Sequence, residues 1–324
     1  MILVRFFGYL FGIGTVFGVL ASLVVFVYLS KLTDGLADTS TLKNYVPPVM
    51  TRVHASDGRL LAEYARERRL FLPIQAIPDQ IKHAFLSAED KSFYEHFGID
   101  VQGIARAVVV NVRNRGSGRR LVGASTITQQ VAKNFLLTNE VSVDRKIKEA
   151  ILSLRIEQTL TKDQILELYL NEIYLGIGAY GVAAASLLYF DKSVHELSLA
   201  EVAYLAALPK APNNYHPFRY TDKAIVRRNW VIDRMVENGF VELEDAEKAK
   251  AQPLAVVPRK RGAQIAASEY FAEEVRRAVG QIYGEERLYE GGLSVRTTLD
   301  PKLQIEARKA LMNGLVAFDR TRGG

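Results

Sequence analysis

The length, composition and charge of the chain exclude several classes of protein. Its 324 residues are 48% hydrophobic and 10% aromatic, which excludes an intrinsically disordered chain. The formal charge of +6 and the isoelectric point of about 9.3 favour an anionic partner, whether nucleic acid, phospholipid or a phosphorylated substrate. No cysteine is present, so disulfides, thiolate catalysis and cysteine-ligated metal sites are excluded.

The N-terminus predicts a membrane anchor. Residues 6–29 form an uncharged stretch of apolar and small residues, and about 20 such residues span a bilayer as a helix. A cleavable signal has a shorter apolar core of about 7–15 residues, so we expect a retained anchor. Residues 1–5 would form a cytoplasmic tail, because Arg5 lies on that side and cytoplasmic flanks favour positive charge. The rest of the chain would then face outward.

Two elements are predicted between the anchor and the helical region. Residues 30–50 form a polar connector that Pro47 and Pro48 stiffen. Two alternating apolar runs then flank Asp57-Gly58, a turn pair that predicts a β-hairpin. We interpret this hairpin as a small β element and not as a domain.

Helical periodicity dominates from Pro78 to about Gly239. Thr161 with Gln164, and Ser198 with Glu201, have capping-box spacing, which predicts helix starts near 162 and 199. About eight helices and no alternation of strand and helix are predicted, so this region should be all-α. Asn238-Gly239 predicts a helix end. We assign residues 51–250 to one domain on this basis.

The character of the chain changes after Pro253. A basic linker reads VVPRKRGAQ, and a helix over about 268–283, a strand within 291–300 and a helix over about 301–318 follow. A lone strand between two helices cannot bury itself. We therefore interpret residues 251–324 as a linker and the beginning of a missing second domain, and expect the tail from about Gln264 to be mobile.

The first group of chemically interesting residues lies in EDKSFYEHFGID, residues 89–100. If the preceding helix runs through Glu89, then Glu89, Phe93 and His96 share one face, which places a carboxylate beside an aromatic wall. Such a carboxylate is a candidate general base. The alternative is a solvated, charged helix end.

The second group lies in GASTITQQVAKN, residues 123–134. Thr126, Gln130 and Lys133 have the spacing of one helical face, and together they could bind a polyanionic or sugar-like ligand. A polar surface face is the alternative. In the loop just before this stretch, four arginines (Arg113, Arg115, Arg119 and Arg120) surround Gly116-Ser117-Gly118 and would suit anionic head groups or a lipid-linked phosphate. A disordered loop that only adds solubility is the alternative.

The third and fourth groups lie on predicted helices. Arg145 could clamp phosphate oxygens while Glu149 orients the cations or pairs with Glu89, but their i, i+4 spacing is also that of an ordinary helix ion pair. Ile165, Leu168 and Tyr169 have core spacing, and a structural role is the better interpretation of that helix. Glycines 176, 178 and 181 follow it and would allow a tight turn.

These stretches carry a family resemblance. EDKSFYEHFGID, GASTITQQVAKN, RKIKEAILSLRIE and KDQILELYLNEIYLG, in this order and followed by RRNWVIDRM, resemble the motifs of the family 51 glycosyltransferases. The match covers roughly residues 50–250. Residues 270–304 are further similar to the segment that joins this domain to the transpeptidase domain in class A penicillin-binding proteins. We identify neither the Ser-x-x-Lys motif nor the Lys-Thr-Gly motif of the transpeptidase in this sequence, so we expect no cross-linking by this chain.

The resemblance implies a mainly α, lysozyme-like domain that polymerises lipid II into β-1,4 glycan and releases undecaprenyl pyrophosphate. Glu89 would be the general base and Glu149 the second acidic residue, while Lys133 and Arg145 would stabilise the departing pyrophosphate. The resemblance places the following residues in substrate binding: Asp90, Phe93, His96, Thr126, Gln130, Lys133, Asn134, Arg145 and Lys146.

Alternatives and partners complete the prediction. A lytic glycosidase would need a catalytic acid but no diphosphate clamp, and a wall-complex scaffold would not depend on Glu89. No cofactor is required, although a divalent cation near Glu89 and Asp90 could help with the diphosphate. The expected partners are lipid II, the growing glycan strand, the bilayer and cell-wall synthesis proteins. Nucleic acid is not expected, because the anchor places the basic residues outside the cytoplasm.

Overall fold

The computed structural model describes residues 2–45, 50–64, 68–115, 123–138, 140, 142–257 and 268–322. These residues form two compact units, which are described one at a time. The first unit comprises Met1–Asn44 and Ser92–Ile165, and the second comprises Tyr45–Lys91 and Leu166–Gly324. Three predicted features lie outside the described residues, namely the Pro47-Pro48 connector, the arginine loop at 116–120 and the basic linker at 258–264.

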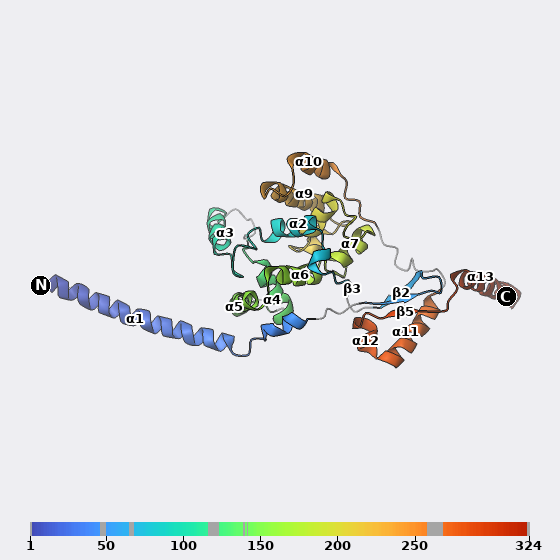
Figure 1. Cartoon of the computed structure of the whole chain (residues 1–324), viewed down its shortest axis with the longest axis horizontal. Helices are drawn as coiled ribbons and strands as arrows, with labels where there is room; N and C mark the ends of the chain where they lie inside the picture. The colour runs from blue at the N-terminus through green and yellow to red at the C-terminus, as the bar shows by residue number, and fades with distance from the viewer. Residues whose placement is uncertain are drawn as a thin grey trace. The chain divides into compact units, whose positions relative to one another are not determined.

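The first unit begins with the long helix α1 (Ile2–Thr33), which contains the predicted anchor (Figure 1). Among the described residues its Gly14–Thr33 part is the one helix apolar and long enough to cross a membrane. The end of this helix is tied to α5 (Val143–Thr159), because the Tyr28 hydroxyl donates to Asp144 Oδ1 at 2.5 Å. The short helix η1 (Thr39–Asn44) follows and also packs on α5.

The remaining helices of the first unit are α3 (Val101–Arg113), α4 (Ile127–Leu136) and the beginning of α6 (Lys162–Glu172). Helices α4 and α5 pack together. Ile127 and Val131 on α4, and Leu152 and Ile156 on α5, are at most 1% exposed. This apolar contact positions the polar side chains at the beginnings of both helices.

The second unit contains most of the other helices, whose bounds are α2 (Asp79–Glu89), α7 (Val182–Phe190), α8 (Leu199–Ala207), α9 (Thr221–Glu237) and α10 (Leu243–Ala251), with short helices η2 (Ile74–Ala76) and η3 (Pro212–Tyr215). Helices α2, α8 and α9 pack against one another. Within the described part of residues 78–239 there are eight α-helices, α2 to α9, as predicted.

The predicted helix boundaries are confirmed where the sequence carried a capping signal. α6 begins after Thr161, whose hydroxyl accepts from Gln164 N, and α8 begins after Ser198, which forms a capping box with Glu201. α9 ends at Asn238-Gly239, where Gly239 has a φ of 75° and Phe240 N donates to Met235 O at 2.9 Å. These bonds satisfy backbone groups that a helix end leaves without partners.

The structural interpretation of α6 is confirmed within the second unit. The Asn171 side chain bonds both backbone groups of Leu72, each at 2.8 Å, and Glu167 accepts from Ile74 N at 2.7 Å. A Cβ atom on Gly181 would lie 2.4 Å from Asn171 O, so only glycine fits there. A two-residue parallel pair, β3 (Arg68–Arg69) with β4 (Ala179–Tyr180), was not predicted.

The predicted hairpin is present, but the predicted lone strand is not alone. β1 (Thr51–His54) pairs antiparallel with β2 (Leu60–Tyr64), and β5 (Ser294–Arg296) pairs in parallel with β1, placing Val53 opposite Val295. The sheet order is β2-β1-β5. The expectation of a lone strand was therefore wrong, because β5 has a partner some 240 residues earlier in the chain.

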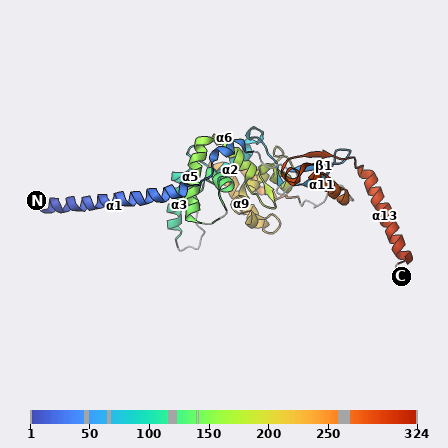
Figure 2. The same cartoon turned by 90° about the horizontal axis from the view of Figure 1, so that it is seen from below.

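Helices complete this small β/α element. α11 (Glu269–Tyr283) and α12 (Glu285–Glu290) lie along one face of the sheet, and Figure 2 again shows α11 beside β1. The helix α13 (Pro301–Arg322) follows β5. The shared core contains Val53, Ala55, Leu61, Ala62, Ala272 and Leu299. Helix α11 thus packs on β2, and α12 and β5 on β1, whereas α13 is exposed from Glu306 to Arg322. The expected mobility of the tail stays a prediction.

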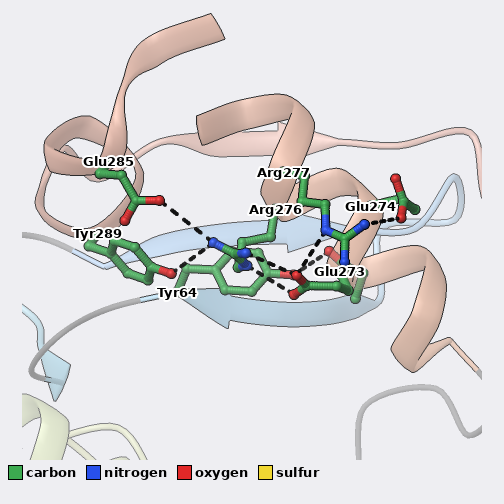
Figure 3. Close-up of polar contacts among 8 residues, drawn as sticks. Tyr64, Glu273, Glu274, Arg276, Arg277, Glu285 and Tyr289 are labelled. Atoms are coloured by element: carbon green, nitrogen blue, oxygen red, sulfur yellow. Dashed lines mark hydrogen bonds and ion pairs between the residues drawn. The ribbon is translucent and has the colours of Figure 1, made fainter. Parts of the chain in front are cut away.

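A polar network also joins α11 to the sheet and to α12 (Figure 3). Arg276 makes a two-pronged contact with Glu273 at 2.9 Å, and its other nitrogen donates to the Tyr289 hydroxyl at 3.2 Å. The Tyr64 hydroxyl donates to Ala272 O at 2.5 Å, and burial raises the pKa of Tyr64 to about 12. All these groups have partners within the element, so the network is structural.

Candidate active site

Glu89 and Asp90 lie at the C-terminal end of α2 in the second unit. The helix ends at Glu89, and Asp90 leaves the helical region with φ −159° and ψ 78°. The prediction that Glu89, Phe93 and His96 share a helical face was therefore wrong, since the residues after Asp90 form turns. Glu89 is half-buried and Asp90 is 6% exposed. Carboxylates at this end lie against the negative pole of the helix dipole, an arrangement that does not favour stability.

Two side chains that the sequence analysis did not select surround Glu89. Tyr169 on α6 is 1% exposed, and its hydroxyl has no hydrogen-bond partner. Burial raises the pKa of Tyr169 well above its usual range, and the charges of Glu89 and Asp90 add to this effect. Arg227 on α9 is 8% exposed; burial lowers its pKa, and the charge of Glu89 opposes that shift.

The carboxylate of Glu89 thus has the phenol ring of Tyr169 and the guanidinium of Arg227 as neighbours. The positive charge of Arg227 lies close enough to the carboxylate of Glu89 to interact with it. The signal that could have identified Arg227 was present, because it opens RRNWVIDRM, the last of the motifs. Tyr169 had been assigned correctly to the core.

Phe93 and His96 belong to a turn of the first unit. Phe93 is fully buried, with Lys162 Nζ 4.4 Å from its ring centroid and the His96 ring edge-on at 6.3 Å. Lys162 also donates to His96 O at 2.6 Å and to Glu157 Oε1 at 2.7 Å. These contacts hold the turn, and they give Phe93 a packing role in this structure.

Thr126 is the N-cap of α4 and not a member of its outer face. Its hydroxyl donates to Gly98 O at 2.6 Å and accepts from Gln129 N at 3.1 Å. Gln129 Oε1 accepts from Thr126 N in return, which completes a capping box. The face predicted from Thr126, Gln130 and Lys133 is therefore corrected, since Thr126 is 2% exposed and its hydroxyl already bonds to the fold.

The remaining polar residues of α4 do share a face. Gln130, Lys133 and Asn134 have i, i+3, i+4 spacing on the helix. Lys133 and Asn134 are exposed, whereas Gln130 is partly buried. This face can therefore present an amide and an ammonium to a ligand.

The first turns of α5 form the densest charged cluster of the first unit. Glu149 is 3% exposed and pairs with Lys146 Nζ at 2.7 Å and with Arg145 Nε at 3.4 Å. Lys146 Nζ also donates to Ser125 Oγ at 2.7 Å, which links the cluster to the residue before the α4 cap. Arg145 Nε and Glu149 Oε1 both lack a hydrogen-bond partner.

The chemistry of this cluster is that of an anion site. Two cations lie near the N-terminus of α5, where the helix dipole adds partial positive charge. The buried carboxylate of Glu149 contacts both cations, so the predicted ion pair is present, while the predicted orientation of the cations toward a phosphate stays a prediction. The cluster joins Arg145, Lys146 and Glu149 within the first unit, while Glu89 and Asp90 belong to the second.

Two other predicted features can be compared with the structure. Among the described residues no group of three or more His, Asp or Glu side chains could hold a metal ion, so assistance by a divalent cation stays a prediction. Ser40 and Lys43 do have Ser-x-x-Lys spacing, which the sequence analysis overlooked. They lie in η1, where Ser40 Oγ donates to Asp38 Oδ2 at 2.5 Å, so a local turn accounts for the pattern.

The sequence is similar to a known protein family and to proteins of bacterial cell-wall synthesis. Residues 57–236 match the family model described as transglycosylase. Penicillin-binding protein 1A from Rickettsia felis is 49% identical over 288 residues, which cover 89% of this chain and 36% of that protein. The protein of that name from Escherichia coli is 42% identical over 289 residues, covering 89% of this chain and 33% of that protein.

A solved structure gives a similar result. The crystal structure of penicillin-binding protein 1A from Haemophilus influenzae matches 86% of this chain and 31% of that chain, with a TM-score of 0.50 and 27% identity. The chain therefore spans about a third of the length of the relatives that it matches.

Proposed function

Because the chain belongs to the transglycosylase family, we propose that it is a peptidoglycan glycosyltransferase that polymerises lipid II and releases undecaprenyl pyrophosphate. The observation that carries the proposal is the pair of cations, Arg145 and Lys146, held by the buried carboxylate of Glu149. A glycosidase needs no such group, because its leaving group is a sugar hydroxyl and not a diphosphate.

In the proposed reaction the 4-hydroxyl oxygen of the acceptor sugar attacks C1 of the donor sugar. The bond from O4 to C1 forms, and the bond from C1 to the pyrophosphate oxygen breaks with inversion. Glu89 receives the hydroxyl proton, and the lipid pyrophosphate leaves with the bonding electron pair. We assign Glu89 as general base from its family motif and from the charge of Arg227 beside it.

Arg145 and Lys146 stabilise the negative charge that develops on the departing pyrophosphate. Charge-assisted bonds from two positioned cations are worth more than bonds from neutral donors. On α4, Lys133 is exposed and Gln130 is partly buried. Both supply further hydrogen-bond donors to the lipid-linked sugar that is transferred. The positions of Asp90, Phe93, His96, Thr126 and Asn134 in substrate binding remain proposals from the resemblance.

Glu149 takes a positioning role in this proposal. It is 3% exposed, and its two oxygens face Arg145 and Lys146. A carboxylate whose two oxygens already contact cations is placed to orient those cations. The second acidic residue of the motif therefore orients the cations and does not transfer the proton.

The proposed setting is the outer face of the cytoplasmic membrane. Helix α1 would anchor the chain with its N-terminus in the cytoplasm, and its junction with α5 at Tyr28 and Asp144 would hold the cation cluster near the bilayer surface. A lipid-linked substrate lies in the same surface. The bilayer, the growing glycan strand and other cell-wall synthesis proteins are the proposed partners.

The test is incubation of the whole chain in detergent with labelled lipid II. We expect a glycan polymer and an equal release of lipid pyrophosphate, with both lost in Arg145→Ala and Lys146→Ala. Arg155→Ala, on the same helix but outside the cluster, is the matched control and should retain activity. Cleavage of preformed glycan in place of polymerisation would instead identify a glycosidase.

A further inference from the structure

One face of α9, with the residue that precedes the helix, carries a series of aromatic and cationic residues, of which the proposed reaction uses only Arg227. Its members are Tyr220, Lys223, Arg227, Trp230 and Arg234, here called the α9 stripe. At 100° per residue the four members within the helix fall within an arc of about 60°, and the helix rise spreads them over about 17 Å, while Tyr220 is the residue before the first turn. The stripe runs beside the face that packs on α2 and α8.

The aromatic rings of the stripe lie against its cations. Arg227 Cζ is 3.7 Å and Arg234 Cζ is 5.5 Å from the centroid of the Trp230 ring. Lys223 Nζ is 5.0 Å from the centroid of Tyr220. Stacked cations orient the rings and reduce the conformational freedom that a ligand would otherwise have to remove. Tyr220 and Trp230 remain 46% and 36% exposed.

Arg227 gives the stripe a buried polar group without a partner. The residue is 8% exposed, and its Nε has no hydrogen-bond partner. A buried donor left without an acceptor is costly unless a ligand supplies one. Arg227 also lies close enough to Glu89 to interact with its charge, so the stripe extends along α9 from the neighbourhood of the proposed general base.

Acidic side chains near the stripe offset only part of its positive charge. Arg234 pairs with Glu237, while Asp233 pairs with Lys250 of α10 at 2.5 Å. Asp222, in the first turn of α9, is a further neighbouring acid. Lys223 and Arg227 have no carboxylate partner within hydrogen-bond distance among the described residues. Among the three cations of the stripe, Lys223 therefore carries the least compensated positive charge, and it lies beside the ring of Tyr220.

We propose that the α9 stripe binds the glycan strand, a polysaccharide that carries carboxylates on its peptide substituents. The C–H faces of sugar rings pack on exposed aromatic rings, and the cations pair with carboxylates. This inference rests on the proposed function only for the identity of the polymer. A bilayer surface fits the stripe less well, because the exposed aromatic rings alternate with cations and form no continuous apolar band.

Trp230 allows a direct test, because it is the only tryptophan of the chain. Lipid-free, uncross-linked glycan oligosaccharides with intact peptide stems are titrated into the whole chain in detergent. We expect a saturable change of tryptophan fluorescence. Lys223→Ala and Arg234→Ala should each weaken the affinity about 10-fold, because a lost charged contact is worth about 1.4 kcal/mol.

Matched variants separate binding from folding and from catalysis. Lys248→Ala, on the exposed side of α10, should bind as the parent does. The Glu89→Gln variant should also bind the oligosaccharides, even if it polymerises nothing. Unchanged far-ultraviolet circular dichroism would show that the two stripe variants are folded.

The outcomes distinguish this inference from the proposed function. If the parent polymerises lipid II but the oligosaccharides leave the Trp230 fluorescence unchanged, the stripe proposal is overturned and the function stands. Binding without polymerisation by the parent would support the stripe and remove the proposed enzyme activity. A response to vesicles of anionic phospholipid, with none to glycan, would show a lipid-binding face and overturn the proposal.

Discussion

Replacing Lys146 by alanine should reduce both the stability and the activity of the protein. The contacts of Lys146 allow the size of each loss to be estimated. Lys146 pairs at 2.7 Å with Glu149, which is 3% exposed, while the Lys146 side chain itself is 49% exposed. Breaking a fully buried pair costs about 3–5 kcal/mol, and an exposed pair is worth at most about 1 kcal/mol. Because Arg145 remains beside the carboxylate at 3.4 Å, we expect a loss of about 1–2 kcal/mol.

The expected loss of activity is larger. Removing one positioned donor from a developing charge typically costs about 10²–10³ in rate. The loss of stability corresponds to about 2–8 °C in the apparent unfolding temperature for a domain of about 200 residues. Polymerisation of lipid II and thermal unfolding of the same detergent-solubilised preparation measure the two effects.

A second substitution distinguishes the two effects. In the Lys146→Ala/Glu149→Gln double variant the buried group is neutral but Arg145 loses its carboxylate partner, so only part of the stability should return while the activity should not. Recovery of activity together with stability would refute the reasoning, because the rate loss would then have come from misfolding. Equal stability of the single and double variants would contradict the assigned ion pair.

Two further predictions concern stability. Thr126→Ala should lower the unfolding free energy by about 2–3 kcal/mol, because the helix cap is worth about 1 kcal/mol and the buried Gly98 carbonyl loses its donor; Thr126→Ser should retain most of it in the same thermal assay. Burial against Phe240 lowers the pKa of His83, so the folded state binds fewer protons and stability should fall as the pH drops below about 6.5. His83→Gln should flatten this dependence, whereas His195→Gln, at an exposed position, should not.

The local part of the fold could be predicted because its signals are local. The capping residues at Thr161 and Ser198 marked two helix starts, and both were found. Thr126 and Gln129 carry the same spacing, yet the stretch was interpreted as one continuous helical face. Applying the capping rule there would have removed Thr126 from the face and left Gln130, Lys133 and Asn134.

The pairing of β5 with β1 could not be predicted in the same way. Arg52 and Ser294 are partners across the sheet but far apart in the sequence. Alternation predicts a strand but does not identify its neighbour, because the pairing depends on which apolar faces meet. One core contains Val53 and Leu61 of the hairpin and Ala272 of α11. The sequence of any one of these segments does not predict that they pack together.

In the candidate site, too, contacts within one helix could be predicted from the sequence, whereas contacts between helices could not. The i, i+4 spacing of Arg145 and Glu149 predicted their ion pair, because one helix sets both positions. Tyr169 and Arg227 lie on α6 and α9, so their approach to Glu89 depends on helix packing. A sequence can place a carboxylate at the end of a helix, but the side chains that surround it come from other helices.

The measurement that tests the central claim most directly is the rate of lipid II polymerisation by the parent and by Glu89→Gln, each compared at equal folded concentration. The substitution keeps the size of the side chain and removes its ability to accept the proton. We predict that the parent forms glycan and releases lipid pyrophosphate in equal amounts, while the variant loses at least about 10²-fold in rate. Polymerisation by Glu89→Gln at the rate of the parent would contradict the assignment of the general base.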